Sequence, residues 1–231
     1  MQNAQNEVIS EIKKLKRKLK ELVHHLDHTF RVKRINREKA GSIACSGREI
    51  KLEIGAGDKK GANGWTTLDL GPACDLQWDL REGIPFPDAS VSIIYSSHLF
   101  EHIPYNGIVG LLKECRRVLK PSGIISICVP NAKPYLVGYA NKDRTFWNSI
   151  PKFHQPAITH HCDIDMVNYI VYMAGEHNYM FDEENLVSIL QENGFRDAKV
   201  RKFDPDLDMK ERDLESIYAV GTADALPQSD P

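Results

Sequence analysis

The first 30 residues carry apolar side chains at alternating steps of four and three along an otherwise polar stretch. These positions are Val8, Ile12, Leu15, Leu19, Leu22 and Leu26. Such spacing aligns them on one helical face, as in the seam of a short coiled coil. The pattern predicts a basic amphipathic helix over residues 1–40 that joins copies of the chain into a homodimer or larger homo-oligomer through residues 8–30. Packing of the same face on the chain's own domain is the alternative.

Charge separates this helix from the rest of the chain. Residues 1–40 hold 11 Lys or Arg and 5 Asp or Glu, a net of +6, whereas the remaining residues hold 19 and 27, a net of −8. A basic helix can bind anionic membranes or nucleic acid, but this seam has no Trp and the acidic remainder repels phosphate. We therefore expect no nucleic-acid partner. Residues 31–47, which are basic and then small and polar, predict a linker.

Beyond residue 47 the pattern changes to short apolar runs that alternate with helical segments. Strands are predicted at 49–54, 65–70, 75–78, 91–95, 123–129, 198–203 and 216–221. The clearest helix covers 108–120, and a second begins at the N-cap Asp182 and ends at Gly194. The alternation predicts an α/β domain over residues 41–231 with a long insertion at about 132–180, on the side of the acceptor substrate.

Composition excludes several other protein classes. Hydrophobic residues make up 42% and charged residues 27% of the 231 residues, which is the balance of a globular protein. No apolar run approaches the roughly 18 residues of a membrane span, and the N-terminus lacks the apolar stretch of a secretory signal. The five cysteines include no C-x-x-C pair and are expected to be reduced thiols. A cytoplasmic protein without a membrane span is therefore predicted.

Acidic residues and glycines mark the ends of the first three predicted strands. Glu53 lies inside the first strand, and Gly55 and Gly57 form the turn that follows, where glycines let a ligand approach the backbone. Asp69 ends the second strand, where a carboxylate can hold a ribose diol, and Asp79 follows the third. These positions predict a ligand site at one edge of the sheet.

The full order of motifs is more specific than the glycine turn alone. The nicotinamide fingerprint G-x-G-x-x-G fails, because Lys60 stands at its third glycine. With the runs SSHLFEH at 96–102 and LLKECRRVLKPSG at 111–123, however, the chain resembles class I S-adenosylmethionine-dependent methyltransferases. The resemblance covers residues 51–131. It implies a Rossmann-like, seven-stranded sheet with helices on both faces, and S-adenosyl-L-methionine as the cofactor.

The resemblance also implies which residues contact the cofactor. The acid of the first strand and the turn after it face the methionine part of the cofactor. The acid of the second strand holds the ribose, and the residues after the third strand flank the adenine. The turn after the fourth strand runs beneath the sulfonium. In this order the residues are Glu53, Gly55, Ala56, Gly57, Asp69, Leu70, Asp79, Leu80, Ser97 and His98. Two features depart from the family. Lys59 replaces the usual third glycine, and the short link between the first two strands predicts a helix of only a turn or two.

Within this superfamily the chain looks most like small bacterial methyltransferases of polysaccharide and cell-surface glycan synthesis. The narrower resemblance implies O-methylation of a sugar or glycan precursor. A non-catalytic scaffold that only binds the cofactor is one alternative. Methylation of RNA or protein is another, with the basic helix docking the substrate, although residues 96–99 read Ser-Ser-His-Leu rather than the Asn-Pro-Pro-aromatic motif often used for base amines.

A hydroxyl acceptor must lose its proton, and histidine suits this task because its pKa lies near neutral pH. His98 is the first candidate for the general base, since the turn after the fourth strand faces the reacting carbon in the family that the chain resembles. The alternative for His98 is a hydrogen bond to a backbone carbonyl or to the cofactor. His177 is the second candidate and His154 the third. His102, with Glu101 beside it, is expected to pack at the start of the next helix.

Residues 160–165, which read HHCDID, place metal-ligand residue types close together. Their spacing matches no named metal motif, so a polar lid loop is the preferred interpretation and no metal is expected. The insertion and its flanks are rich in aromatic residues that either line an acceptor pocket or form ordinary core. They are Tyr135, Tyr139, Trp147, Phe153, Tyr169, Tyr172 and Tyr179.

Overall fold

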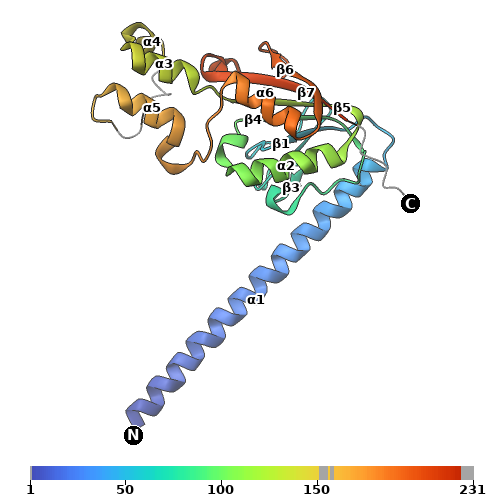
Figure 1. Cartoon of the computed structure of the whole chain (residues 1–231). Helices are drawn as coiled ribbons and strands as arrows, with labels where there is room; N and C mark the ends of the chain where they lie inside the picture. Colours follow the sequence, from blue (N-terminus) through green and yellow to red (C-terminus); the bar gives the residue numbers. More distant parts are fainter. Residues whose placement is uncertain (1, 151–155, 157–158, 225–231) are drawn as a thin grey trace.

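The computed structural model describes residues 2–150, 156 and 159–224, and its centre is a seven-stranded mixed sheet (Figure 1). All seven predicted strands are present. They are β1 (Lys51–Ile54), β2 (Trp65–Asp69), β3 (Leu76–Gln77), β4 (Val91–Ser97), β5 (Leu119–Pro130), β6 (Phe195–Arg201) and β7 (Ser216–Ala223). The spatial order is β3-β2-β1-β4-β5-β7-β6, and only the pairings of β7 are antiparallel.

The strand order reverses between β1 and β4. The chain builds outward from β1 to β3 and then returns to place β4 against the other side of β1. In open α/β sheets, ligands bind in the crevice at the carboxyl ends of the strands beside such a switch point. The turn after β1 and the turn after β4 therefore flank the same crevice.

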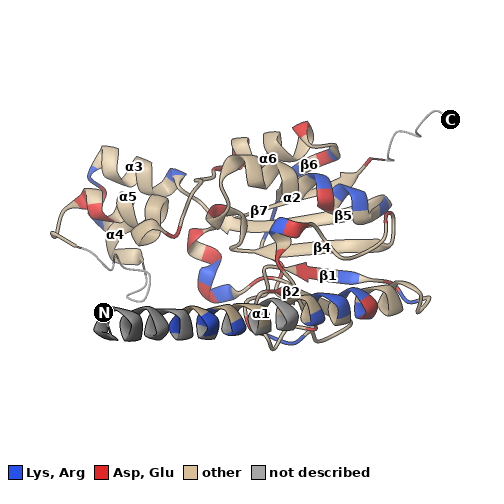
Figure 2. Ribbon diagram, turned by 90° about the horizontal axis from the view of Figure 1, so that it is seen from below, with Lys and Arg blue, Asp and Glu red and all other residues tan. Residues whose placement is uncertain are grey.

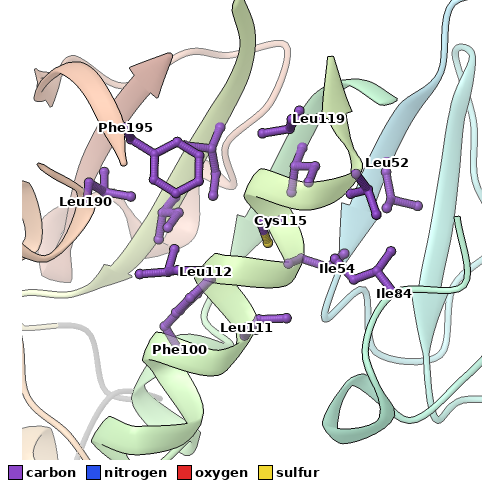
Figure 3. Packing of buried hydrophobic residues seen from close by; sticks show 14 of the residues in the cluster. Leu52, Ile54, Ile84, Phe100, Leu111, Leu112, Cys115, Leu119, Leu190 and Phe195 are labelled. Atoms are coloured by element: carbon purple, nitrogen blue, oxygen red, sulfur yellow. The ribbon is translucent and has the colours of Figure 1, made fainter. Parts of the chain in front are cut away.

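The two predicted helices of the domain form and pack on one face of the sheet. They are α2 (Tyr105–Val118) and α6 (Glu183–Glu192), and the Asp182 side chain caps α6 by accepting from Asn185 N–H, as predicted. Figure 3 shows α2 with Leu111, Leu112 and Cys115 directed among Leu52 and Ile54 of β1 and Phe195 of β6. Burial of each large side chain here contributes about 1.5–3 kcal/mol.

The expected helices on both faces of the sheet require a correction. Residues 55–64 and 70–75, which join β1 to β2 and β2 to β3, contain no helix, although a shortened one was predicted after β1. Crossover helices at these positions would cover the face opposite α2. That face instead carries a polar cluster, in which Tyr95 donates to Asp208 and the Arg201 guanidinium binds the Asp208 carboxylate at 2.6 and 2.8 Å.

The N-terminal helix α1 runs from Gln2 to Ala44, so the linker predicted at 31–47 is wrong over most of its length. Its C-terminal third packs on the β3 end of the sheet. Asn36 accepts from the backbone N–H of Gln77 at 3.2 Å, the Arg37 guanidinium lies over the Trp78 ring, and Ala40 is fully buried. The rest of α1 projects away from the domain (Figure 1), and its described part carries Lys and Arg along its length (Figure 2).

The insertion forms a small helical unit beside the carboxyl edge of the sheet. Its helices are α3 (Lys133–Asn141), α4 (Arg144–Ser149) and α5 (Asp163–Tyr172), followed by the 3₁₀ turn η4 (Met173–Gly175). The unit has its own apolar core, formed by Tyr135, Trp147, Ile150, Met166 and Ile170. Among the residues that the structure describes, no helix has both the length and the apolar character needed to cross a bilayer.

Candidate active site

The turn after β1 and the turn after β4 are in direct contact. Gly55 has a φ of +72°, in the left-handed region that glycine tolerates best. A Cβ atom at Gly55 would lie only 2.7 Å from Cβ of Leu99, the residue after His98. The glycine therefore allows the two loops that flank the crevice to approach each other.

Asp69 ties the turn after β1 to the end of β2. Its carboxylate accepts from the backbone N–H of Gly57 at 2.8 Å and from that of Leu70. Each carboxylate oxygen offers two lone pairs, so acceptor capacity remains for a ligand hydroxyl. Gly57 has a φ of +69°, and a Cβ built on it would meet nothing within 4 Å, so the space beside this turn is open.

Lys59 lies where the sequence departs from the resembled family. Its ammonium is 2.6 Å from Oε1 of Glu53, whose side chain is mostly buried on β1. The side chain of Lys59 thus places a positive charge next to the Glu53 carboxylate. The link between β1 and β2 is further fixed by the Asp58 carboxylate, which accepts from Ala73 N–H at 2.8 Å.

The end of β3 lies beside Asp69, because Trp78 N–H donates to the Asp69 carbonyl at 2.8 Å. The next residue, Asp79, binds the Arg81 side chain through both carboxylate oxygens, and these hydrogen bonds lower the pKa of Asp79. Leu80 packs against the main core, whereas Leu70 is exposed. Ala56 lies between the two glycines in the turn, and Ser97 ends β4 opposite Cys128.

A cavity of about 850 Å³ lies between the carboxyl edge of the sheet and the insertion, and we call it the edge cavity. Its lining includes His98, Glu101 and His102 from the segment after β4, Tyr169 and His177 from the insertion, and Arg212 from the segment before β7. Sequence reasoning missed Arg212 and Glu215, and no motif marks them. They reach the cavity through the 3₁₀ helix η5 (Lys210–Glu215).

His98 lies at the junction of the crevice and the edge cavity. Its backbone has a φ of +53°, and its N–H donates to the Cys128 carbonyl at 2.9 Å. The imidazole is hydrogen-bonded at Nε2, 2.9 Å from Ser216 Oγ, and its Nδ1 faces Glu101 Oε1 at 3.4 Å. The ring is therefore fixed in orientation and borders the edge cavity.

Glu101 is a buried carboxyl group next to His98. Both of its oxygens lack a hydrogen-bond partner among the described residues. Desolvation by burial raises its pKa to about 8. The prediction that His102 packs at the start of the next helix, with Glu101 beside it, is confirmed in position, since both lie in the 3₁₀ turn η2 (Phe100–His102) before α2.

His177 reaches the edge cavity from the end of the insertion. Its Nδ1 lies 2.9 Å from the Ile170 carbonyl, and burial is the main reason that its pKa is lowered. Burial therefore favours the neutral form of this imidazole. His154, the third predicted base, lies outside the described residues.

The aromatic residues predicted to line an acceptor pocket or form core differ in where they lie. Tyr169 and Tyr172 line the edge cavity, while Tyr135 and Trp147 belong to the insertion's own core and Tyr139 is exposed. Tyr179 stacks on Tyr105 and contacts Phe181. Phe153 lies outside the described residues.

The acids of the HHCDID run have structural partners. The Asp165 carboxylate accepts from the backbone N–H groups of His160 and Cys162 at 2.7 and 3.1 Å, and Asp163 pairs with Arg144 at 2.9 Å. These contacts hold the segment before α5 in place.

Comparison with known proteins agrees with the motif order. Residues 52–127 match the family model of a methyltransferase domain. The segment is therefore similar to a methyltransferase domain. S-adenosylmethionine is the cofactor of the resembled class, and both Gly57, in the turn after β1, and Asp69, at the end of β2, lie inside the matched range. A comparison with curated proteins gives no match.

The domain is also similar to solved methyltransferases. A phosphoethanolamine N-methyltransferase 2 from Haemonchus contortus, solved with S-adenosyl-L-methionine, shares 14% identity and a TM-score of 0.49 over 82% of this chain, which spans 52% of that protein. An S-adenosylmethionine-dependent methyltransferase from Archaeoglobus fulgidus shares 17% identity and a TM-score of 0.47, over 83% of this chain and 94% of that one.

Proposed function

We propose that the chain transfers the methyl group of S-adenosylmethionine to a hydroxyl of a sugar or glycan precursor. The observation that carries this proposal is the position of His98, whose imidazole borders the polar edge cavity and whose next residue, Leu99, contacts the turn after β1. The bound cofactor would supply an electrophilic methyl group on a positively charged sulfur. The open space at Gly57 and the spare lone pairs of Asp69 fit the methionine and ribose parts of this molecule.

In this proposal the chain holds the acceptor hydroxyl in line with the methyl group and removes its proton. Alignment contributes much of the rate, because it replaces a collision of free molecules. The oxygen–methyl bond forms as the sulfur–methyl bond breaks, the electron pair stays on sulfur, and the hydroxyl proton passes to Nδ1 of His98. Nε2 already carries a proton, because Ser216 Oγ donates to the Arg212 carbonyl and so accepts from Nε2–H. Glu101 Oε1 lies 3.4 Å from Nδ1 of His98, so the ionised form of Glu101 would stabilise the imidazolium that results.

The lining of the edge cavity favours a polar acceptor. Asn168, Asp165, Arg212 and Glu215 bring side-chain donors and acceptors to the wall, while Tyr169 supplies an aromatic face on which a sugar ring can stack. An acceptor of a few sugar rings suits a space of about 850 Å³. Methyl transfer from labelled cofactor to nucleotide sugars and oligosaccharides tests this class.

Replacing Asp69 with alanine is expected to weaken S-adenosylmethionine binding by about 10–100-fold, the loss of hydrogen bonds to a charged group. Calorimetric titration with S-adenosylmethionine and S-adenosylhomocysteine measures the loss, with NAD as a ligand that should not bind. Asp58→Ala is the matched control, because Asp58 also accepts a backbone N–H in the same loop but has no assigned cofactor contact. Unchanged affinity in Asp69→Ala, or equal loss in both variants, would refute the assignment.

We also propose that the projecting part of α1 associates with a second copy of the chain. Leu15, Leu19 and Leu22 are each more than half exposed, although they belong to the predicted seam. Deletion of residues 2–28 removes this part and leaves Asn36 and Ala40 on the domain. The expected result is a folded protein of smaller mass by light scattering, and an unchanged mass would reject the association.

The basic, projecting part of α1 also keeps one alternative function open. If the chain methylates RNA or protein, the same deletion should abolish activity on the macromolecule, and activity of the full chain should fall steeply with salt. Retained activity on sugars after the deletion would favour the glycan acceptor.

A further inference from the structure

Glu101, His102 and His177 converge on one point in the wall of the edge cavity. Each offers one ligand atom, and these atoms all lie within 4.8 Å of one another. The rings of His102 and His177 are 5.0 Å apart between centroids and meet edge to face. Two imidazoles and one carboxylate are a ligand set that suits divalent transition metals.

Both histidines have their ring orientation fixed by a backbone carbonyl. Nδ1 of His102 lies 3.0 Å from the Glu176 carbonyl, and Nδ1 of His177 lies 2.9 Å from the Ile170 carbonyl. A carbonyl oxygen only accepts, so in each ring Nδ1 carries the proton and Nε2 of the neutral ring presents a lone pair. Such a hydrogen bond on the opposite nitrogen is the usual support of a histidine that binds a metal.

The carboxylate of Glu101 supplies the third lone-pair donor. Its side chain is about 98% buried, and neither oxygen has a hydrogen-bond partner among the described residues. Burial of this carboxyl group without a hydrogen-bond donor disfavours its charged form, and His102 Nε2 stands 3.7 Å from its Oε1 with a lone pair rather than a proton. A cation bound between these groups would stabilise the charged form of the Glu101 carboxylate and would accept the lone pair of His102 Nε2.

The backbone holds the two parts of the cluster together. The N–H groups of Asn178 and Tyr179 donate to the Glu101 carbonyl at 2.7 and 3.2 Å, and the Asn178 side chain donates to the His102 carbonyl at 2.9 Å. The segment after β4 is thus bonded to the end of the insertion, next to His177. The three ligands are positioned before any ion arrives.

We propose that Glu101, His102 and His177 bind one divalent transition-metal cation, such as Zn²⁺, whose open coordination positions face the edge cavity. Because the cluster borders the same cavity as His98, the cation would bind an acceptor oxygen and favour its deprotonation. This role rests on the proposed function and narrows the acceptor to hydroxylated molecules that offer an oxygen to a metal, with adjacent hydroxyls best suited. Binding of the cation itself does not depend on catalysis.

The test is calorimetric titration of the full-length, metal-stripped protein with Zn²⁺, supported by the visible absorption of the Co²⁺-loaded protein. We expect one ion per chain for the wild type and at least a 10-fold loss of affinity in Glu101→Gln and in His102→Gln. Both changes are mild for the fold, because glutamine has nearly the shape of glutamate at a carboxyl group that accepts no hydrogen bond from the described residues, and because the ring of His102 is partly exposed. His160→Gln is the control, since His160 lines the same cavity outside the cluster.

Binding of S-adenosylhomocysteine to every variant separates the possible failures. If the wild type binds S-adenosylhomocysteine but not Zn²⁺, the metal site is refuted and the proposed function stands. If Zn²⁺ binds as expected but S-adenosylhomocysteine does not, the proposed function fails and the metal site stands. Zn²⁺ binding that survives both Glu101→Gln and His102→Gln, or that falls equally in His160→Gln, places the ion elsewhere and overturns the proposal.

Discussion

Replacing His98 with asparagine is expected to lower turnover by a factor of about 10²–10⁴ and to leave S-adenosylhomocysteine affinity nearly unchanged. The loss is that of a general base at the junction of the crevice and the edge cavity. Asparagine is the suitable replacement because His98 has a φ of +53°, a conformation that asparagine adopts more readily than alanine does. Single-turnover kinetics with a methyl-accepting sugar measure the effect on the chemical step.

Ser216→Ala is the matched comparison for this experiment. It removes the hydroxyl 2.9 Å from His98 Nε2, together with its hydrogen bond to the Arg212 carbonyl, but keeps the imidazole. A loss of about 2–10-fold is expected, the value of one neutral hydrogen bond. Near-normal turnover in His98→Asn would instead move the role of base to His177 or His154, and turnover that falls equally in both variants would indicate a positional role for His98.

The strands and their carboxyl-edge residues were predictable from the sequence because their signals are local. A buried parallel strand is a short apolar run, and a glycine or an acid directly after it stands at the sheet edge whatever the rest of the fold does. Gly57 and Asp69 illustrate this, since the predicted edge positions turn out to be joined by a hydrogen bond. Their part in cofactor binding stays a prediction.

The course of α1 was not predictable from its apolar spacing. The seam ends near Leu26, and the contacts that continue the helix to Ala44 use a polar and a small residue. Asn36 binds the backbone of Gln77, which lies 41 residues later. Ala40 is fully buried, although it does not belong to the apolar seam. Tertiary contacts of this kind leave no periodicity, so the sequence there suggested a linker.

The convergence of Glu101, His102 and His177 was also hidden from sequence reasoning. His177 lies 75 residues after His102. The HHCDID run was considered as a metal site instead, because its ligand residue types are close together in the sequence. In the structure the scattered residues, and not those of the run, bring their ligand atoms together. The carboxylates of the run accept backbone N–H groups or pair with Arg144, while the scattered residues meet in the wall of the edge cavity. Spacing finds metal sites only when the ligands share one short element.

Replacing Gly55 with alanine is expected to destabilise the domain by about 2–5 kcal/mol and to reduce turnover of the folded fraction. Holding alanine at a φ of +72° costs about 1–2 kcal/mol, and forcing a methyl group against Leu99 adds about 1–3 kcal/mol. The new Cβ would lie 2.7–2.9 Å from Cβ, Cγ and Cδ2 of Leu99, so the whole side chain must move. Chemical denaturation measures the stability and steady-state kinetics the turnover.

Gly64→Ala separates the contact with Leu99 from backbone strain alone. Gly64 also has a positive φ, +83°, but a Cβ there meets nothing within 4 Å, so this variant should lose only about 1–2 kcal/mol and keep normal turnover. The difference between the two variants measures how strictly the turn after β1 sets the position of the turn that carries His98. Equal stability and equal turnover in both would show that Leu99 yields freely and that the two turns act independently. A larger loss of turnover in Gly55→Ala is expected, because Leu99 directly follows His98 and a displacement of about 1 Å at a reacting group can cost 10²-fold in rate.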